Sequence, residues 1–174
     1  EVKSVNSIND ICLLIFNSIK KVLGKKGTIL VPTYSYSFGN FSNKKKSFFN
    51  PLKTESMIGP FPNFFIKLNK IERSIDPMVS IAGLGPKAKK ILTNIPFSSY
   101  GKGCIFERIL RIKNAKCCNI GLGPNWMPFI HYLDWKNKAP FRYDKFFQGV
   151  IAHKRKKHKI IWHYPVRVLR KESV

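Results

Sequence analysis

A chain of 174 residues, 44% of them hydrophobic, can build one domain with a packed core, which excludes a largely disordered protein. The formal net charge of +23 raises nucleic acid as a partner, but the excess is mostly lysine spread along the chain, without an arginine-rich face for reading bases. No apolar run is long enough to span a bilayer and no secretory signal is visible, so we expect a cytoplasmic protein without a membrane partner.

Helix and strand patterns alternate through the first half of the chain. Residues 8–24 carry apolar side chains at helical spacing and end in a glycine, a natural C-cap. Residues 27–38 begin as a continuous apolar run, which suits a strand covered on both faces, and Pro32 should end its ladder. The segment 43–60 is typical of a loop, and 59–71 has the pattern of a short helix with a proline in its first turn.

The second half continues the alternation. Residues 78–86 are strand-like, and both 87–95 and 105–114 have amphipathic helix patterns. Residues 115–123 are predicted to form a buried strand that ends in glycines. Residues 128–139 are the next helix candidate, directly after that strand.

The C-terminal segment 146–169 has the pattern of a β-hairpin whose tip is the basic run HKRKKHK, residues 153–159. The run fits either a solvated tip or a contact for the phosphates of an anionic cofactor or partner. Strands that alternate with helices predict an α/β fold. We expect a layered α/β/α sandwich with a central, mainly parallel or mixed sheet, plus this hairpin, in a single domain over residues 1–174.

Four cysteines show neither a CxxC pair nor a metal-ligand spacing, so we predict no metal site. They are Cys12, Cys104, Cys117 and Cys118. The last two are adjacent and would point to opposite faces of the strand predicted at 115–123. Buried free thiols in a reducing cytoplasm are the simplest account of all four.

The segment FIHYLD, residues 129–134, places a histidine and an aspartate three residues apart in an otherwise apolar and aromatic stretch. The whole chain has only four histidines and nine acidic residues. In a helix, His131 and Asp134 share one face, where an imidazole and a carboxylate can act as a base and its orienting partner. The spacing alone leaves open a helix-surface ion pair or a hydrogen-bonded core histidine.

Five stretches, taken together and in order, carry a family resemblance. They are GTILVPTYSYSF (27–38), RSIDPMVSIAGLGPKA (73–88), YGKGCIFERIL (100–110), CNIGLGPNWMPFIHYLD (118–134) and APFRYDKFFQG (139–149). The chain resembles the aminoglycoside 3-N-acetyltransferase family, which are acetyl-CoA-dependent enzymes unrelated in fold to the common GNAT acetyltransferases. The resemblance implies an acyltransferase with acetyl-CoA as co-substrate and a small-molecule amine, an aminoglycoside or an amino sugar, as acceptor.

The resemblance also implies the catalytic residues. In the family, the histidine of an LHxAE-like motif is the general base on the acceptor amine, and here that motif covers residues 130–134. The catalytic candidates are therefore His131 as base and Asp134 as the orienting or acceptor-binding carboxylate. A histidine pKa near ~6.5 suits proton transfer at neutral pH. Direct transfer needs no covalent intermediate, and no GxSxG nucleophile motif is present.

The resemblance also implies residues that contact the acyl and pantetheine end of acetyl-CoA. Residues 32–36, PTYSY, correspond to the family's PTFTY, and Ser80 corresponds to the serine of its HSVAA motif. Cys104 replaces a serine of the family and is not expected to be a nucleophile. The cofactor-binding candidates are Thr33, Tyr34, Ser35, Tyr36, Ser80, Tyr100, Gly101 and Cys104. For residues 32–36, hydroxyls that merely cap a strand-end turn are the alternative.

Departures from the family pattern bear on the acceptor. Asp76 begins the segment that stands where antibiotic-modifying members usually have HPxxS, and the surrounding pattern is closer to relatives encoded among surface-polysaccharide genes. Such relatives would acetylate an amino sugar. The chain is also poor in carboxylates, whereas aminoglycosides are polycations best held by acidic pockets.

Several alternatives stay open at this point. The family's first strand and its CoA-contacting loop would precede Glu1, so we expect the chain to lack them. A monomer and a homodimer are both compatible with the sequence. A basic nucleic-acid-binding module, motivated only by charge, and a truncated, inactive relative are the competing functional hypotheses.

Overall fold

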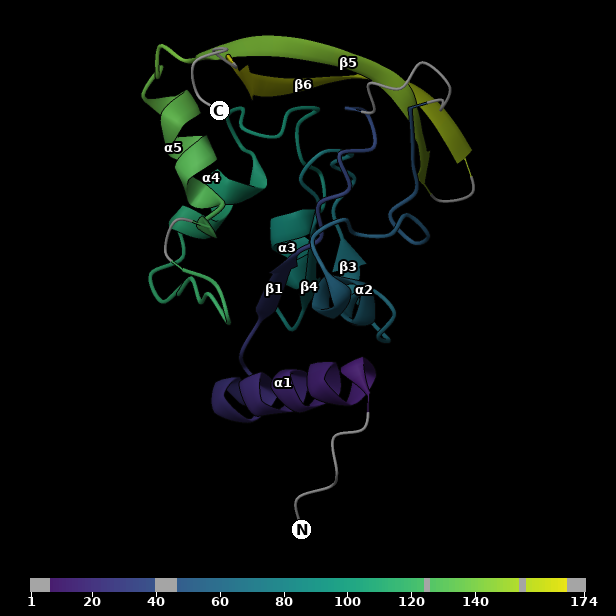
Figure 1. The fold of residues 1–174 in the computed structure, drawn as a ribbon, viewed down its shortest axis with the longest axis vertical. Helices are drawn as coiled ribbons and strands as arrows, with labels where there is room; N and C mark the ends of the chain where they lie inside the picture. Colours follow the sequence, from purple (N-terminus) through teal and green to yellow (C-terminus); the bar gives the residue numbers. More distant parts are fainter. Residues whose placement is uncertain (1–6, 40–46, 124–125, 154–155, 169–174) are drawn as a thin grey trace.

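The computed structural model of the chain describes residues 7–39, 47–123, 126–153 and 156–168. Its elements are α1 (Ile8–Leu23), β1 (Ile29–Pro32), β2 (Phe48–Phe49), α2 (Pro60–Phe65), β3 (Glu72–Arg73), β4 (Ile81–Leu84), α3 (Ala88–Leu92), α4 (Ile105–Leu110), α5 (Phe129–Lys136), β5 (Arg142–His153) and β6 (Lys156–Arg167). In Figure 1, the β5–β6 hairpin and α1 lie at opposite ends of the molecule, with the short strands β1, β3 and β4 between them.

The strands form two small sheets rather than a single central one. The first has the order β1-β4-β3 and is antiparallel throughout, and the second has the order β2-β5-β6. Within the second sheet β5 and β6 are antiparallel, and only the short β2 runs parallel to β5. The expected α/β class and C-terminal hairpin are confirmed. Neither sheet is mainly parallel: the first is antiparallel, and the second is mixed because β2 runs parallel to β5 while β6 runs antiparallel to it.

Helix α1 follows the sequence pattern closely. Ser7 caps its start by accepting a hydrogen bond from the backbone amide of Asp10 at 3.2 Å. Gly24 ends it with a φ of 64°, in the left-handed region where glycine carries no steric cost. Of its apolar residues only Cys12 and Phe16 are buried, so the helix covers the first sheet with a narrow stripe.

The strand predicted at 115–123 is wrong. Residues 115–119 have no regular structure, no described strand pairs with them, and both Cys117 and Cys118 are exposed. The side chain of Asn119 instead donates to the carbonyl of Gly123 at 3.0 Å and closes a local turn. An apolar run predicts burial only where a neighbouring strand can satisfy its backbone, and that condition is not met here. Of the four thiols, Cys12 and Cys104 are buried as expected.

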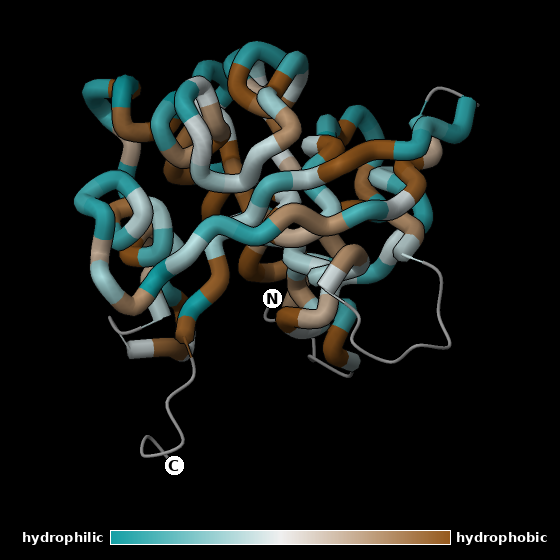
Figure 2. Tube along the Cα trace, turned by 90° about the horizontal axis from the view of Figure 1, so that it is seen from above, coloured by the Kyte–Doolittle hydropathy of each residue, from teal (hydrophilic) through white to brown (hydrophobic). Residues whose placement is uncertain are grey.

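Other differences concern boundaries. The predicted loop 43–60 contains the two-residue strand β2, which adds to the edge of the hairpin. The hairpin starts at Arg142, four residues earlier than predicted, and its two strands pair residue for residue from Arg142–Arg167 to His153–Lys156. Figure 2 shows the hairpin crossing the molecule, with apolar stretches along the strands and hydrophilic residues toward the closed end. Part of the basic run predicted at the tip, residues 154–155, lies outside the described residues.

The main core lies beneath the hairpin. Trp162 of β6 is completely buried, and its indole nitrogen donates to the hydroxyl of Ser99 at 2.9 Å. Gly149 of β5 allows the close approach of the Phe38 ring, because a Cβ at this position would lie 2.5 Å from two ring carbons. The hairpin therefore packs on the loop that follows β1. A short connection joins α5 to β5, so the position of the hairpin also determines the position of α5.

Candidate active site

Helix α5 presents the predicted catalytic pair on one face. Its other side is anchored by Tyr132, whose buried ring stacks on that of Phe106 in α4 with centroids 6.3 Å apart. His131 and Asp134 lie one helical turn apart and away from this anchor, and both side chains keep contact with solvent.

A tight turn brings β5 back alongside the helix. Lys138 has a φ of 52°, a left-handed conformation, and the amide of Ala139 donates to the Asp134 carbonyl at 2.9 Å. The chain therefore reverses within a few residues of the end of α5, and the first residue of β5, Arg142, faces the pair.

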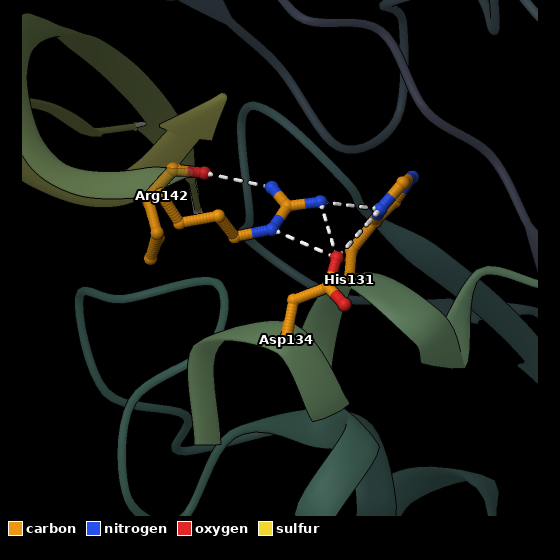
Figure 3. Close-up of polar contacts among 4 residues, drawn as sticks. His131, Asp134 and Arg142 are labelled. Carbon is orange, nitrogen blue, oxygen red and sulfur yellow. Dashed lines mark hydrogen bonds and ion pairs between the residues drawn. The ribbon is translucent and has the colours of Figure 1, made fainter. Parts of the chain in front are cut away.

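Arg142 joins the two predicted catalytic residues (Figure 3). Its Nε and Nη2 both donate to Oδ2 of Asp134, at 3.0 and 2.9 Å, and Nη2 also lies 2.6 Å from Nδ1 of His131. Nη1 donates to the carbonyl of Pro165 in β6 at 3.4 Å, so the guanidinium is held by the hairpin as well. Nδ1 of His131 and Oδ2 of Asp134 are 4.0 Å apart, too far for a hydrogen bond.

The electrostatics of the cluster favour the neutral form of His131. Partial burial lowers the pKa of the imidazole, and the positive charges of Arg142 and Arg167 lower it further. Asp134 acts in the opposite direction, but its carboxylate is engaged by Arg142. The Arg142 side chain is only 7% exposed, Asp134 21% and His131 46%, so the imidazole is the most accessible member. A neutral, accessible imidazole beside a cation has the protonation state that a general base needs.

A hollow of about 570 Å³ adjoins the cluster on the Asp134 side. Its lining includes Asp134, Lys136, Lys138, Arg142 and Asp144. Both of its carboxylates already have partners, since Asp134 binds Arg142 and Asp144 accepts from Nε2 of His163 at 2.8 Å. The lining therefore offers more unpaired positive than negative charge.

The hydroxyls predicted to contact the cofactor lie inside the protein. Thr33 and Ser80 are fully buried, with their Oγ atoms 3.0 Å apart, and the Ser80 hydroxyl donates to the Thr33 carbonyl at 2.7 Å. Ser35 is buried too and donates to the carbonyl of Pro77 at 3.2 Å. These contacts give the three side chains a structural role at the end of β1, and contact with the cofactor stays a prediction for them.

The aromatic candidates differ in accessibility. Tyr36 is 37% exposed and has a φ of 47°, a strained conformation for a residue with a side chain. Tyr34 is buried, and its hydroxyl has no hydrogen-bond partner within the described part of the chain. Tyr100 is fully buried, with its ring 5.4 Å from that of Tyr164. Among the cofactor candidates, Tyr36 has the most exposed side chain.

Gly101 and Cys104 bracket the turn into α4. A Cβ on Gly101 would lie 2.7 Å from the Ser98 hydroxyl, so only glycine fits there without movement. Cys104 is the N-cap residue of α4 and is 1% exposed, and burial raises the pKa of its thiol to about 11. A thiol in this state is not a nucleophile at neutral pH, in line with the sequence interpretation.

Sequence reasoning did not single out two arginines that organise these regions. Arg142 was part of the stretch APFRYDKFFQG, but nothing in the spacing showed that it would reach back eight residues to Asp134. Arg73 lies behind the predicted cofactor residues and donates to the hydroxyls of Thr33 and Ser80 at 3.0 and 3.2 Å. The available signal in both cases was an arginine within a stretch that carries the family resemblance.

The described residues contain no group of three or more His, Cys, Asp or Glu side chains placed to hold a metal ion. None of the helices within the described ranges is long and apolar enough to cross a membrane.

Comparison with solved structures relates this geometry to known folds. The structure of AAC-IIIb in its binary complex with CoASH matches with a TM-score of 0.75 and 16% identity, over 88% of this chain and 62% of that one. AAC-VIa bound to sisomicin matches with a TM-score of 0.75 and 17% identity, over 95% and 67% of the two chains. The YokD protein from Bacillus subtilis matches with a TM-score of 0.70 and 15% identity, over 92% and 69%.

The chain thus spans 62% of the length of AAC-IIIb, and at these identities the likeness concerns the fold alone. No curated protein matches the chain. The family model described as aminoglycoside 3-N-acetyltransferase matches residues 1–170, which confirms the resemblance found in the sequence. Because this match covers nearly the whole chain, the protein belongs to the aminoglycoside 3-N-acetyltransferase family.

Proposed function

We propose that the protein is an acetyl-CoA-dependent N-acetyltransferase in which His131 is the general base. The observation that carries the proposal is the cluster of His131, Asp134 and Arg142, which combines a neutral imidazole with a carboxylate in a chain of this family. The matching structure of AAC-IIIb with CoASH supports acetyl-CoA as the co-substrate.

In the proposed reaction the acceptor amine attacks the thioester carbonyl carbon of acetyl-CoA. A C–N bond forms, the C–S bond breaks, and the sulfur leaves with the electron pair of that bond. His131 takes the proton that the amine loses, and this proton or one from water converts the leaving thiolate to CoA thiol. Positioned base catalysis of this kind contributes ~10²–10⁴-fold in rate. Asp134 offsets the positive charge that the imidazole acquires.

For the acceptor we propose an amino sugar rather than a polycationic aminoglycoside. A polycation needs several carboxylates that are free to receive its ammonium groups. In the hollow beside α5 both carboxylates are already paired, and Lys136 and Lys138 add like charge. The structure of AAC-VIa with sisomicin shows that an aminoglycoside binds to that relative, so both acceptor classes belong in the test.

The experiment is a thiol-release assay with acetyl-CoA and two matched panels, one of aminoglycosides and one of nucleotide-linked amino sugars. We expect CoA release that depends on the acceptor and is faster with the amino sugars. Release that is faster with aminoglycosides would overturn the acceptor assignment. Absence of acceptor-dependent release with every amine would overturn the enzymatic function.

The basic nucleic-acid-binding module is not favoured. The family match accounts for most of the chain, whereas only charge motivated the alternative. Binding to DNA or RNA that falls steeply with salt, in a protein without affinity for CoA, would reverse this preference.

A further inference from the structure

The contact between Arg142 and His131 determines which ring nitrogen carries the proton. Nη2 of Arg142 lies 2.6 Å from Nδ1 of His131, and a guanidinium can only donate hydrogen bonds. Nδ1 is therefore the acceptor, and the proton of the neutral ring sits on Nε2. A ring in this state has no free lone pair, because Arg142 engages one nitrogen and the other is a donor.

Asp134 is the group that can hold the opposite tautomer. Its Oδ2 lies 4.0 Å from Nδ1 of His131 and accepts from both Nε and Nη2 of Arg142. If Nη2 leaves Nδ1, a small ring movement lets an Nδ1–H donate to Oδ2, while Nε of Arg142 keeps its own bond to the carboxylate. Nε2 of the ring then carries a free lone pair.

We propose that Arg142 is a positioning residue that holds His131 in its Nε2-protonated form. When Nη2 withdraws from Nδ1, the ring can form an Nδ1–H hydrogen bond to Asp134 instead. Nε2 is then unprotonated and can accept the proton of the acceptor amine. The exchange is balanced, since the ring gives its Nε2 proton to water and takes one from water at Nδ1. The inference rests on the proposed base role of His131. It adds the step in which Nε2 of this base becomes free to accept a proton.

The charged groups around the ring agree with this arrangement. Arg142 from β5 and Arg167 from β6 oppose a positive charge on His131, and Asp134 from its own helix favours it. In an imidazolium, Nδ1 carries a proton and would face Nη2 of Arg142, so two hydrogen-bond donors would oppose each other. Protonation of His131 therefore also requires Nη2 to leave, which couples the tautomer, the pKa and the position of Arg142.

Nitrogen NMR of the protein labelled with ¹⁵N-histidine tests the proposal, with His131→Gln to assign the resonances. In the wild type we expect neutral His131 with a protonated Nε2 and an unprotonated, hydrogen-bonded Nδ1. In Arg142→Met the Nδ1 resonance should move toward its protonated position. The pKa of His131 should rise, because a cation is lost and Asp134 is released. In Arg142→Met with Asp134→Asn, the rise should be smaller.

His163 is the internal control. Its Nδ1 lies 2.7 Å from the Ser98 hydroxyl and its Nε2 lies 2.8 Å from Oδ1 of Asp144, without contact to Arg142. Its resonances should stay as in the wild type, which also reports that the hairpin is intact.

A wild-type neutral ring protonated on Nδ1 would overturn the proposal, and so would an unchanged tautomer and titration in Arg142→Met. If Arg142→Met does not fold, the wild-type tautomer remains decisive. The NMR measurement needs no turnover. An inactive protein with the expected tautomers would therefore refute the proposed function and leave the role of Arg142 standing.

Discussion

Two arginines organise two regions of this molecule in different ways. Arg73 is 9% exposed, and within the described part of the chain it donates to uncharged oxygens, which include the Thr33 carbonyl at 2.8 Å and the Thr54 carbonyl at 2.5 Å. The Arg142 side chain is 7% exposed, but its partners are a carboxylate and an imidazole that both reach solvent. The first arrangement joins three backbone segments, and the second joins two titratable side chains.

The difference bears on which of the two regions suits the proposed chemistry. Burial without a counter-ion lowers the pKa of Arg73 to about 10, so the group stays a cation at neutral pH and its partners cannot exchange protons. The partners of Arg142 can titrate and can change hydrogen-bond partner. We therefore interpret the Arg73 region as a clamp that holds the end of β1, and the Arg142 region as the reactive one.

The largest expected effect on stability is that of Arg73→Met. The carbonyls of Pro51 and Thr54 would lose the guanidinium as a donor, and each unsatisfied buried group costs about 1–3 kcal/mol. We expect the free energy of unfolding in urea to fall by about 3 kcal/mol. Arg142→Met should cost less, because water can reach Asp134 and His131 after the change.

Arg111→Met is the matched control for these two variants. Its side chain is 73% exposed and pairs with Glu107 one turn earlier, so stability should not change measurably. An Arg142→Met variant that is destabilised more than Arg73→Met would contradict the distinction between clamp and reactive cluster.

A second effect concerns pH and the buried carboxyl of Asp76. Burial raises its pKa from the ordinary 3.8 to about 6, although the amides of Met78 and Val79 and the Ser99 side chain favour the charged form. The folded protein thus holds this proton more tightly than the unfolded chain. The stabilising contribution is complete below about pH 4 and is lost as the pH rises through about 6.

Asp76→Asn should remove this dependence and keep an oxygen acceptor for both amides. The difference in unfolding free energy between wild type and variant should change by about 1–3 kcal/mol between pH 4 and pH 7. Urea denaturation at several pH values measures it. Parallel curves for the two proteins would show that Asp76 ionises normally.

The smallest effect is expected for Gly149→Ala, at the contact that seats the hairpin. The new methyl group would meet the Phe38 ring at 2.5 Å, and overpacking of this kind costs about 1–3 kcal/mol, here near the lower end because a ring can tilt. Gly123→Ala is the control, since nothing lies within 4 Å of its added Cβ. Equal melting temperatures for the two variants would show that the Phe38 contact does not position β5.

Much of the fold follows from local patterns in the sequence. The cap residues of α1, the end of β1 at Pro32 and the long hairpin are each determined by nearby residues, and each lies close to its predicted place. The strand predicted around Cys117 and Cys118 depended on a partner strand elsewhere in the chain, which an apolar run cannot specify.

The same limit applies to the candidate site. The helical spacing correctly placed His131 and Asp134 on one face, because three residues make nearly one turn. The arrival of Arg142 depends on the left-handed turn at Lys138 and on the hairpin register, which are tertiary features. The burial of Thr33 and Ser80 also could not be predicted, since a hydroxyl at a strand end suits a ligand and a neighbouring serine equally well.

The most direct test of the central hypothesis is the pH dependence of kcat/KM for wild type, His131→Gln and His158→Gln, the last an exposed control. If His131 is the base, the wild-type value should rise with pH to a plateau, with a midpoint below the ordinary histidine pKa. His158→Gln should match it, and His131→Gln should lower the plateau by ~10²–10⁴-fold and abolish the histidine-dependent rise. A His131→Gln variant that keeps the wild-type rate and pH profile would contradict the assignment of His131 as the base.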